Sequence, residues 1–177
     1  MSQPPRTPEE ARDIIHKYLQ KTLRELPEGY ILDSSRFGGV GGNLSPCDDT
    51  PAPESPLSMY DNWRVLVSHS ETNYNSIIGK VGDIWRGWGW PVEERNGFDK
   101  PNRFSISPDG YTLSIKAAPS GNPQSPPSVI VTSPCFQVNT QLYQAIPEPV
   151  IITRDGFDYA QPSESDVPEK PSNLYKW

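Results

Sequence analysis

Basic side chains, long apolar runs and cysteines are all scarce in this sequence. Its 177 residues include 16 Lys and Arg against 22 Asp and Glu, which gives a net charge of −6. Phosphate binding needs clustered basic residues, so this charge argues against a nucleic-acid partner. No apolar stretch approaches the roughly 18 residues that cross a bilayer, and no charged-then-apolar leader opens the chain. The sequence therefore predicts a body without a transmembrane segment.

Motifs of known chemistry are absent as well. The sequence contains no G-x-S-x-G nucleophile elbow and no His-Glu-x-x-His zinc motif. The glycine-rich stretch FGGVGGN at residues 37–43 lacks the Lys-Ser or Lys-Thr of a phosphate-binding loop, and proline-rich sequence follows it instead of a helix. We therefore predict a protein that is not an enzyme and that needs no cofactor.

The composition indicates one compact domain that carries long irregular segments. A chain of 177 residues has the length of a single ordinary domain. Hydrophobic residues make up only 34% of the chain, and its 21 prolines are more than twice the usual number.

Two segments show the three- and four-residue apolar spacing of amphipathic helices. At the start of the first, Thr7 can cap the helix, Pro8 fits its first position, and Glu10 lies where a capping box places a carboxylate. This helix is expected to end at Pro27. The second is expected over residues 71–86.

Shorter segments with alternating apolar residues predict an antiparallel sheet of about five to six strands. The turn Pro108-Asp109-Gly110 is expected to join two of them as a hairpin. The order of helices and strands predicts an α+β fold in which the two helices cover one face of the sheet. The expected strands are residues 30–36, 62–70, 90–95, 103–107, 111–117 and 128–133.

The composition changes after residue 144. Residues 145–177 contain repeated prolines with interspersed acidic residues, which is typical of an extended or partly disordered tail. We therefore expect a single α+β domain over residues 1–144, followed by a proline-rich C-terminal arm over residues 145–177. The apolar stretch PVIITRDGFDY at residues 149–159 of this arm could still dock on the body or on a partner.

The two cysteines, Cys47 and Cys135, each follow a Ser-Pro dipeptide. A structural zinc site needs four soft ligands at close spacing, and a redox motif needs two cysteines close together, whereas these two are 88 residues apart. Two free buried thiols are the alternative that a cytosolic protein would favour. The matching context and the count of two favour a single disulfide, and with it an oxidising compartment.

The order of several short sequence features resembles that of small mycobacterial cell-envelope lipoproteins of the LppA type. This resemblance implies an exported, lipid-anchored domain with one disulfide and no established biochemical activity, and it brings no catalytic residues. The lipid-bearing cysteine near the mature N-terminus is missing, so an anchor is expected only in an uncut precursor. The features lie within residues 9–136 and are an amphipathic helix, LPEGY at 26–30, a glycine-rich stretch before the first Cys, a helix ending in GWGW at 87–90, DGYTLSI at 109–115 and SPCF at 133–136.

Two regions are candidates for contact with a ligand or partner. Trp88 and Trp90 flank a glycine at the expected end of the second helix, where large rings serve as a lid on the core or as a contact surface for lipid, sugar or protein. The second region is the glycine-rich loop, with Phe37 and Gly39 as its candidate contact residues.

One cluster offers an alternative with chemistry. His69 follows an expected strand and could meet Asp48, Asp49 or Glu71 in a cleft, where these side chains would form an acid/base or metal site. The simpler interpretation of His69 is a solvent-exposed residue at a strand end.

These features favour a monomeric, exported cell-envelope domain without catalysis, which binds a protein or a hydrophobic or glycan ligand. The expected location is extracellular or in the cell envelope. One alternative is a small secreted metal-dependent hydrolase that uses His69. Another is a cytoplasmic interaction protein of the immunity or phage-encoded type, whose acidic surface captures a basic partner.

Overall fold

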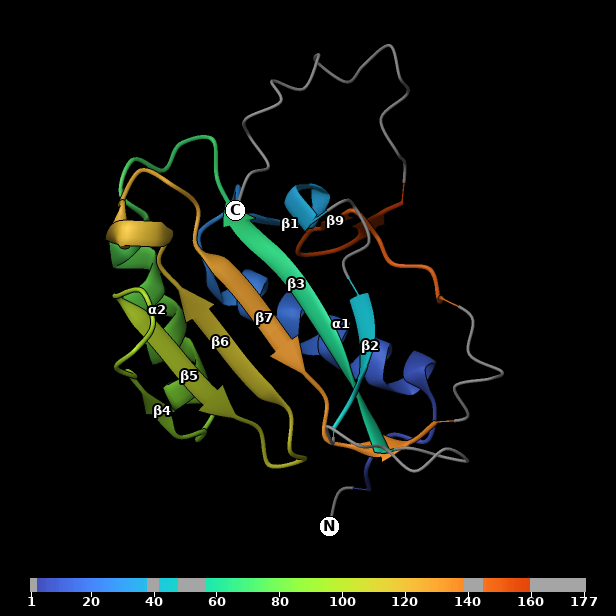
Figure 1. Cartoon of the computed structure of the whole chain (residues 1–177). Coiled ribbons are helices and arrows are strands. Elements are labelled where there is room, and N and C mark those ends of the chain that lie inside the picture. Colours follow the sequence, from blue (N-terminus) through green and yellow to red (C-terminus); the bar gives the residue numbers. More distant parts are fainter. Residues whose placement is uncertain (1–2, 38–41, 48–56, 139–144, 160–177) are drawn as a thin grey trace.

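The computed structural model describes residues 3–37, 42–47, 57–138 and 145–159. These residues form two α-helices and a large antiparallel sheet, so the predicted α+β class is confirmed. The helices lie behind the sheet in Figure 1, and the opposite face of the sheet is turned toward the viewer.

Helix α1, Pro8–Glu25, begins where the capping signal predicts. The Oγ1 atom of Thr7 accepts a hydrogen bond from the Glu10 amide at 3.1 Å, and Pro8 occupies the first helical turn. Helix α2, Tyr74–Gly87, begins three residues later than predicted. The side chain of Asn73 caps it by accepting a hydrogen bond from the Asn75 amide at 3.0 Å.

Within the described residues the sheet has ten strands, which is more than the predicted five to six. Eight of them follow the order β10-β9-β1-β3-β7-β6-β5-β4, and β2 and β8 pair with β3 beside this row. The strands are β1 (Ile31–Asp33), β2 (Gly42–Pro46), β3 (Leu57–Val67), β4 (Val92–Glu93), β5 (Asn102–Ile106), β6 (Thr112–Lys116), β7 (Ser128–Thr132), β8 (Phe136–Gln137), β9 (Ile151–Ile152) and β10 (Phe157–Asp158).

Strand β3 is long enough to pair with four other strands. On one side, residues 58–62 pair with β2 and residues 65–67 with β1; on the other side, residues 57–58 pair with β8 and residues 61–65 with β7. Residues 42–46 therefore join the sheet as β2, although the glycines and prolines around them predict a loop. The pairing with β3 supplies the hydrogen bonds that outweigh the low strand propensity of this segment.

Alternation along the strands divides the sheet into a helix-covered face and an open face. In β7, Val129 and Val131 are buried in the core beneath the helices, while Ser128 and Ile130 lie on the opposite side. The core between sheet and helices includes Trp85 of α2, whose indole nitrogen donates a hydrogen bond to Thr22 of α1 at 3.1 Å.

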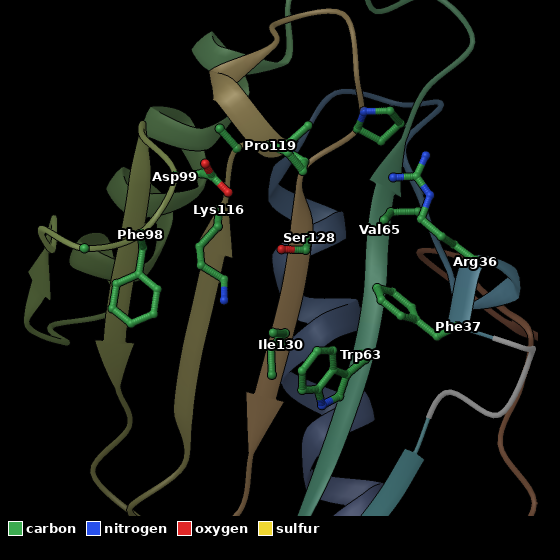
Figure 2. A pocket seen from close by; sticks show the side chains of 14 residues that line it. Arg36, Phe37, Trp63, Val65, Phe98, Asp99, Lys116, Pro119, Ser128 and Ile130 are labelled. Carbon is green, nitrogen blue, oxygen red and sulfur yellow. The ribbon is translucent and has the colours of Figure 1, made fainter. Parts of the chain in front are cut away.

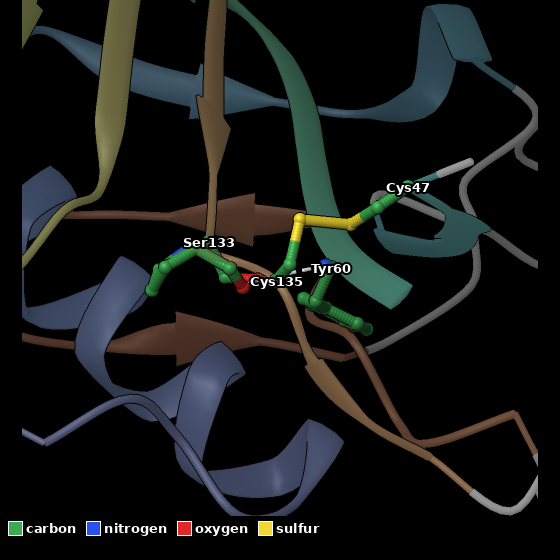
Figure 3. Close-up of a disulfide and its surroundings, with 5 residues drawn as sticks. Cys47, Tyr60, Ser133 and Cys135 are labelled. Carbon is green, nitrogen blue, oxygen red and sulfur yellow. Dashed lines mark hydrogen bonds between the residues drawn. A yellow bond between two sulfur atoms is a disulfide. The ribbon is translucent and has the colours of Figure 1, made fainter. Parts of the chain in front are cut away.

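The predicted disulfide between Cys47 and Cys135 is confirmed, with an S–S distance of 2.11 Å. It ties the end of β2 to the segment just before β8, across one end of β3 (Figure 3). Ser133 adds to this connection, because its amide donates to the Tyr60 carbonyl at 2.9 Å and its hydroxyl accepts from the Tyr60 amide at 2.8 Å. The disulfide therefore fixes both neighbours of β3 at this end.

Part of the predicted C-terminal arm, residues 145–159, lies on the body, as the apolar stretch within it allows. Strand β9 pairs with β1, and β10 pairs with β9 at that edge of the sheet (Figure 1). Ile152 is completely buried and Val150 nearly so. These apolar residues supply the burial that holds the segment on the body despite the prolines before it. The remainder of the predicted tail, residues 160–177, lies outside the described residues.

Neither helix in the described part of the chain is long and apolar enough to cross a bilayer.

Candidate ligand-binding groove

The open face of the sheet is hollowed into a groove of about 720 Å³. Three neighbouring strands form its floor: β3 contributes Trp63 and Val65, β7 contributes Ser128 and Ile130, and β6 contributes Lys116. Trp63 is paired with Ile130 across β3 and β7, so their side chains lie next to each other on this face (Figure 2). The groove thus crosses the middle of the sheet, opposite the helices.

Two irregular segments form the ends of the groove. At one end, the short 3-10 helix Ser35–Phe37 places Phe37 edge-on to Trp63, with a ring centroid distance of 5.9 Å. At the other end, Phe98 packs on Phe104 at 5.1 Å and remains 47% exposed. Trp63 is 43% exposed as well. Large apolar side chains with this exposure on one concave surface indicate a contact site.

The lining contains few polar groups. Of the 14 described residues that line the groove, five have side chains that can form hydrogen bonds, namely Arg36, Trp63, Asp99, Lys116 and Ser128. Burial lowers the pKa of the Lys116 ammonium, although the carboxylate of Asp99 acts in the opposite direction. The Lys116 nitrogen lies 5.3 Å from the centroid of the Phe98 ring.

A second cluster of polar side chains is enclosed on the helix-covered side of the sheet. The Glu148 carboxylate accepts a hydrogen bond from Tyr60 at 2.6 Å and one from Arg64 at 3.0 Å, and it lies 2.8 Å from Nε2 of His16. Burial raises the pKa of Glu148, but hydrogen bonds from His16 and Tyr60 and the charge of Arg64 outweigh it and leave that pKa below its usual value.

This cluster ties separate parts of the chain together. Arg64 is completely buried, and its guanidinium also donates to the Val150 carbonyl at 3.1 Å and to Asn62 at 2.7 Å. Desolvation is the largest influence on Arg64 and lowers its pKa. The charges therefore satisfy one another inside the fold and hold the segment before β9 against β3.

The aromatic residues predicted as contacts lie in different places. Trp90 is buried, packs against Tyr18 of α1 at 5.0 Å and meets Trp88 at 4.9 Å. Trp88 is half-buried beside α1: its indole nitrogen donates to Glu25, and the amine of Lys21 lies 4.2 Å from its ring centroid. The two tryptophans are thus on the helix side and are not part of the groove.

The glycine-rich loop is described only at its borders. Phe37 lies at the end of the groove, as Figure 2 shows, whereas Gly39 falls outside the described residues. The structure therefore brings Phe37 together with Trp63, a residue that the sequence did not single out as a contact.

The possible catalytic cluster around His69 is described only in part. His69 is exposed after β3, and the neighbouring Glu71 accepts a hydrogen bond from Tyr30. Asp48 and Asp49 lie outside the described residues. Among the residues that are described, no three His, Cys, Asp or Glu side chains come close enough together to hold a metal ion.

Sequence reasoning missed Trp63, Phe98 and Lys116 as groove residues. A signal was present in β3, where alternation places Trp63 and Val65 on one face while the other face carries Arg64 and Leu66. Apolar residues on both faces of a strand, in a fold with helices on one face only, predict an exposed apolar surface on the other.

Comparison of the chain with protein-family models, with curated proteins and with solved structures gives no match.

Proposed function

We propose that this protein is a non-catalytic binding domain of the cell envelope or the extracellular space, and that it holds a hydrophobic ligand in the groove on the open face of its sheet. The observation that carries the proposal is the row of partly exposed apolar side chains that runs from Phe37 through Trp63 and Ile130 toward Phe98. Covering these side chains removes apolar surface from water and so favours association.

The floor of the groove argues against a peptide as the ligand. Strand β7 is hydrogen-bonded to β3 on one side and to β6 on the other, and β6 is also paired with β5. The floor therefore offers no strand edge to which an extended peptide could add as a further strand.

The lining argues against a glycan in a different way. Sugar hydroxyls that leave water need hydrogen-bond partners, and unpaired ones cost free energy. Only five of the described lining side chains could serve, one of them an indole that can only donate, and eight of the others are apolar. A hydrocarbon ligand needs no such partners, so it is the class that this surface suits best.

The disulfide supports the proposed compartment. Cytosolic thiols are kept reduced, whereas Cys47 and Cys135 are paired here and are the only two cysteines in the chain. The resemblance to exported envelope lipoproteins agrees with this compartment.

A neutral fluorescent dye tests the groove directly. Nile red should gain emission when it binds the protein, because the apolar lining excludes water from the dye. The Trp63→Ala variant should lose most of this gain, since Trp63 provides the largest ring on the floor. Trp88→Ala is the matched control, because Trp88 lies on the helix side of the sheet.

Circular dichroism must first show that all three proteins are folded. Loss of emission in Trp63→Ala alone supports the groove. Loss in Trp88→Ala alone would move the binding surface to the tryptophan pair at the end of α2. A parent protein that leaves the dye in water would overturn the proposal.

A further inference from the structure

The charges around the groove allow the ligand class to be narrowed. Among the described residues that line the groove, Arg36 and Lys116 are positively charged and Asp99 is negatively charged, which gives a net charge of +1. The whole chain has a net charge of −6, so this positive lining is a local feature that opposes the overall balance. A ligand with one negative charge would neutralise it.

Lys116 is the cation closest to the apolar floor. It stands on β6 beside Ser128 of β7, and Figure 2 shows its side chain between Phe98 and Ile130. Among the described residues, neither Lys116 nor Arg36 has an ion pair within 4.0 Å. An ammonium group that is partly desolvated and has no such partner gains most from a bound anion.

The apolar part of the lining extends away from Lys116 across the strands. From β6 it continues over Ile130 on β7 to Trp63 on β3 and reaches Phe37 beyond it. Neighbouring strands lie about 4.8 Å apart, so the path from β6 to β3 is about 10 Å long before it reaches Phe37. A straight hydrocarbon chain fits such a path.

We propose that the groove binds a single-chain amphiphile with a carboxylate head, a long-chain fatty acid anion, whose head group pairs with Lys116 while its hydrocarbon chain lies over Ile130 and Trp63 toward Phe37. This inference rests on the proposed function. A carboxylate matches the net charge of +1 on the lining, whereas a phosphate monoester carries between about one and a half and two negative charges at neutral pH.

Displacement of Nile red by compounds with the same hydrocarbon chain tests the head group. Laurate should displace the dye at a concentration about tenfold lower than dodecanol does, because a charged hydrogen bond in a partly buried site contributes roughly 1.5 kcal/mol or more. Dodecyltrimethylammonium should be weaker than both. All compounds are used below the concentrations at which they form micelles.

Substitutions at the two cations locate the head group. In Lys116→Met, which keeps much of the apolar stem, the dye should still bind and laurate should lose its advantage over dodecanol. Lys116→Arg should retain that advantage. Arg36→Gln should keep most of the advantage of laurate over dodecanol, because Arg36 contributes only to the electrostatic potential around the head group.

Failure of the fatty-acid assignment can be distinguished from failure of the proposed function. If the dye binds but laurate and dodecanol displace it equally, the fatty-acid assignment is wrong and the hydrophobic groove remains. If laurate loses its advantage over dodecanol in Arg36→Gln but keeps it in Lys116→Met, the head group does not pair with Lys116. Stronger displacement by dodecyl phosphate than by laurate would contradict the assignment of a carboxylate as the head group. No dye binding at all would remove the proposed function as well.

Discussion

Glu148 shows how a single side chain can decide the position of a segment. Its carboxylate, Arg64 and His16 are almost completely removed from solvent. Burying charges costs several kcal/mol each, and only close pairing with further hydrogen bonds recovers that cost. Displacing the segment that carries Glu148 would leave Arg64 buried without its partner. The cluster therefore favours one docked position of residues 145–152 over shifted ones.

The pH dependence of stability tests this role. Replacing Glu148 by Gln should lower the free energy of unfolding at neutral pH by about 3 kcal/mol, because Arg64 loses its counter-charge. The pKa of Glu148 is lower in the folded protein than the unfolded value of about 4.3. The stability that its charge contributes is therefore present above that pH and is lost as the pH falls through the folded pKa.

Urea unfolding of the parent and of Glu148→Gln, from neutral to acidic pH, measures this difference. The gap between the two free energies should be constant near neutral pH and shrink below a pH of about 4.3. Glu28→Gln is the control, because the Glu28 side chain is 93% exposed and its ion pair with Arg154 should contribute little. A gap that does not change with pH would contradict the role of the Glu148 charge.

At the level of elements, local signals predicted the helices better than the strands. The start of α1 was correct because Thr7, Pro8 and Glu10 act within one turn of the chain. Helix α2 starts three residues after its predicted start, because Asn73, which lies in a polar stretch, caps it. The sequence does not predict strands β2, β8, β9 and β10, because most of them are only two residues long and they depend on partners that are distant in sequence.

Two glycines in the middle of α2 have different surroundings. A Cβ atom on Gly79 would have its nearest contact at 3.8 Å, with the end of the Arg103 side chain. A Cβ atom on Gly82 would lie 2.8 Å from Cγ of Arg103, near the base of that side chain. At Gly82 the Arg103 side chain of β5 therefore leaves no room for a methyl group, whereas at Gly79 there is room for one.

Alanine at these two positions should have opposite effects. Gly79→Ala should raise the free energy of unfolding by up to about 1 kcal/mol through helix propensity. Gly82→Ala should lower it, because Arg103 must move away from its 3.0 Å ion pair with Glu94, and overpacking costs roughly 1–3 kcal/mol. Thermal and urea unfolding measure both changes. In an Arg103→Ala background, Gly82→Ala should become stabilising, and equal effects of the two single substitutions would contradict the close approach.

For the whole molecule, the groove depends on an arrangement that the sequence does not display. Its floor brings together β3, β7 and β6, of which only the last two are consecutive strands. Alternation predicted the common face of Trp63 and Val65 but could not tell which face the helices cover. The contact role of the Trp88 and Trp90 pair stays a prediction, and so does that of Gly39. The sequence predicts features formed by residues that are near one another in the chain, but it does not predict a site whose residues come from different strands.

The disulfide acts on the whole molecule because it closes a loop between residues 88 apart in sequence. Chain-entropy arguments give such a crosslink at most about 4–5 kcal/mol of stability. We therefore expect the Cys47→Ser/Cys135→Ser double variant to unfold at lower urea concentration than the parent, and the parent treated with dithiothreitol to unfold like the variant. Intact mass after alkylation provides the control: protein exported to a bacterial periplasm and purified without reductant should take up no label. Two labelled cysteines in this folded, unreduced protein would contradict both the crosslink and the proposed oxidising compartment.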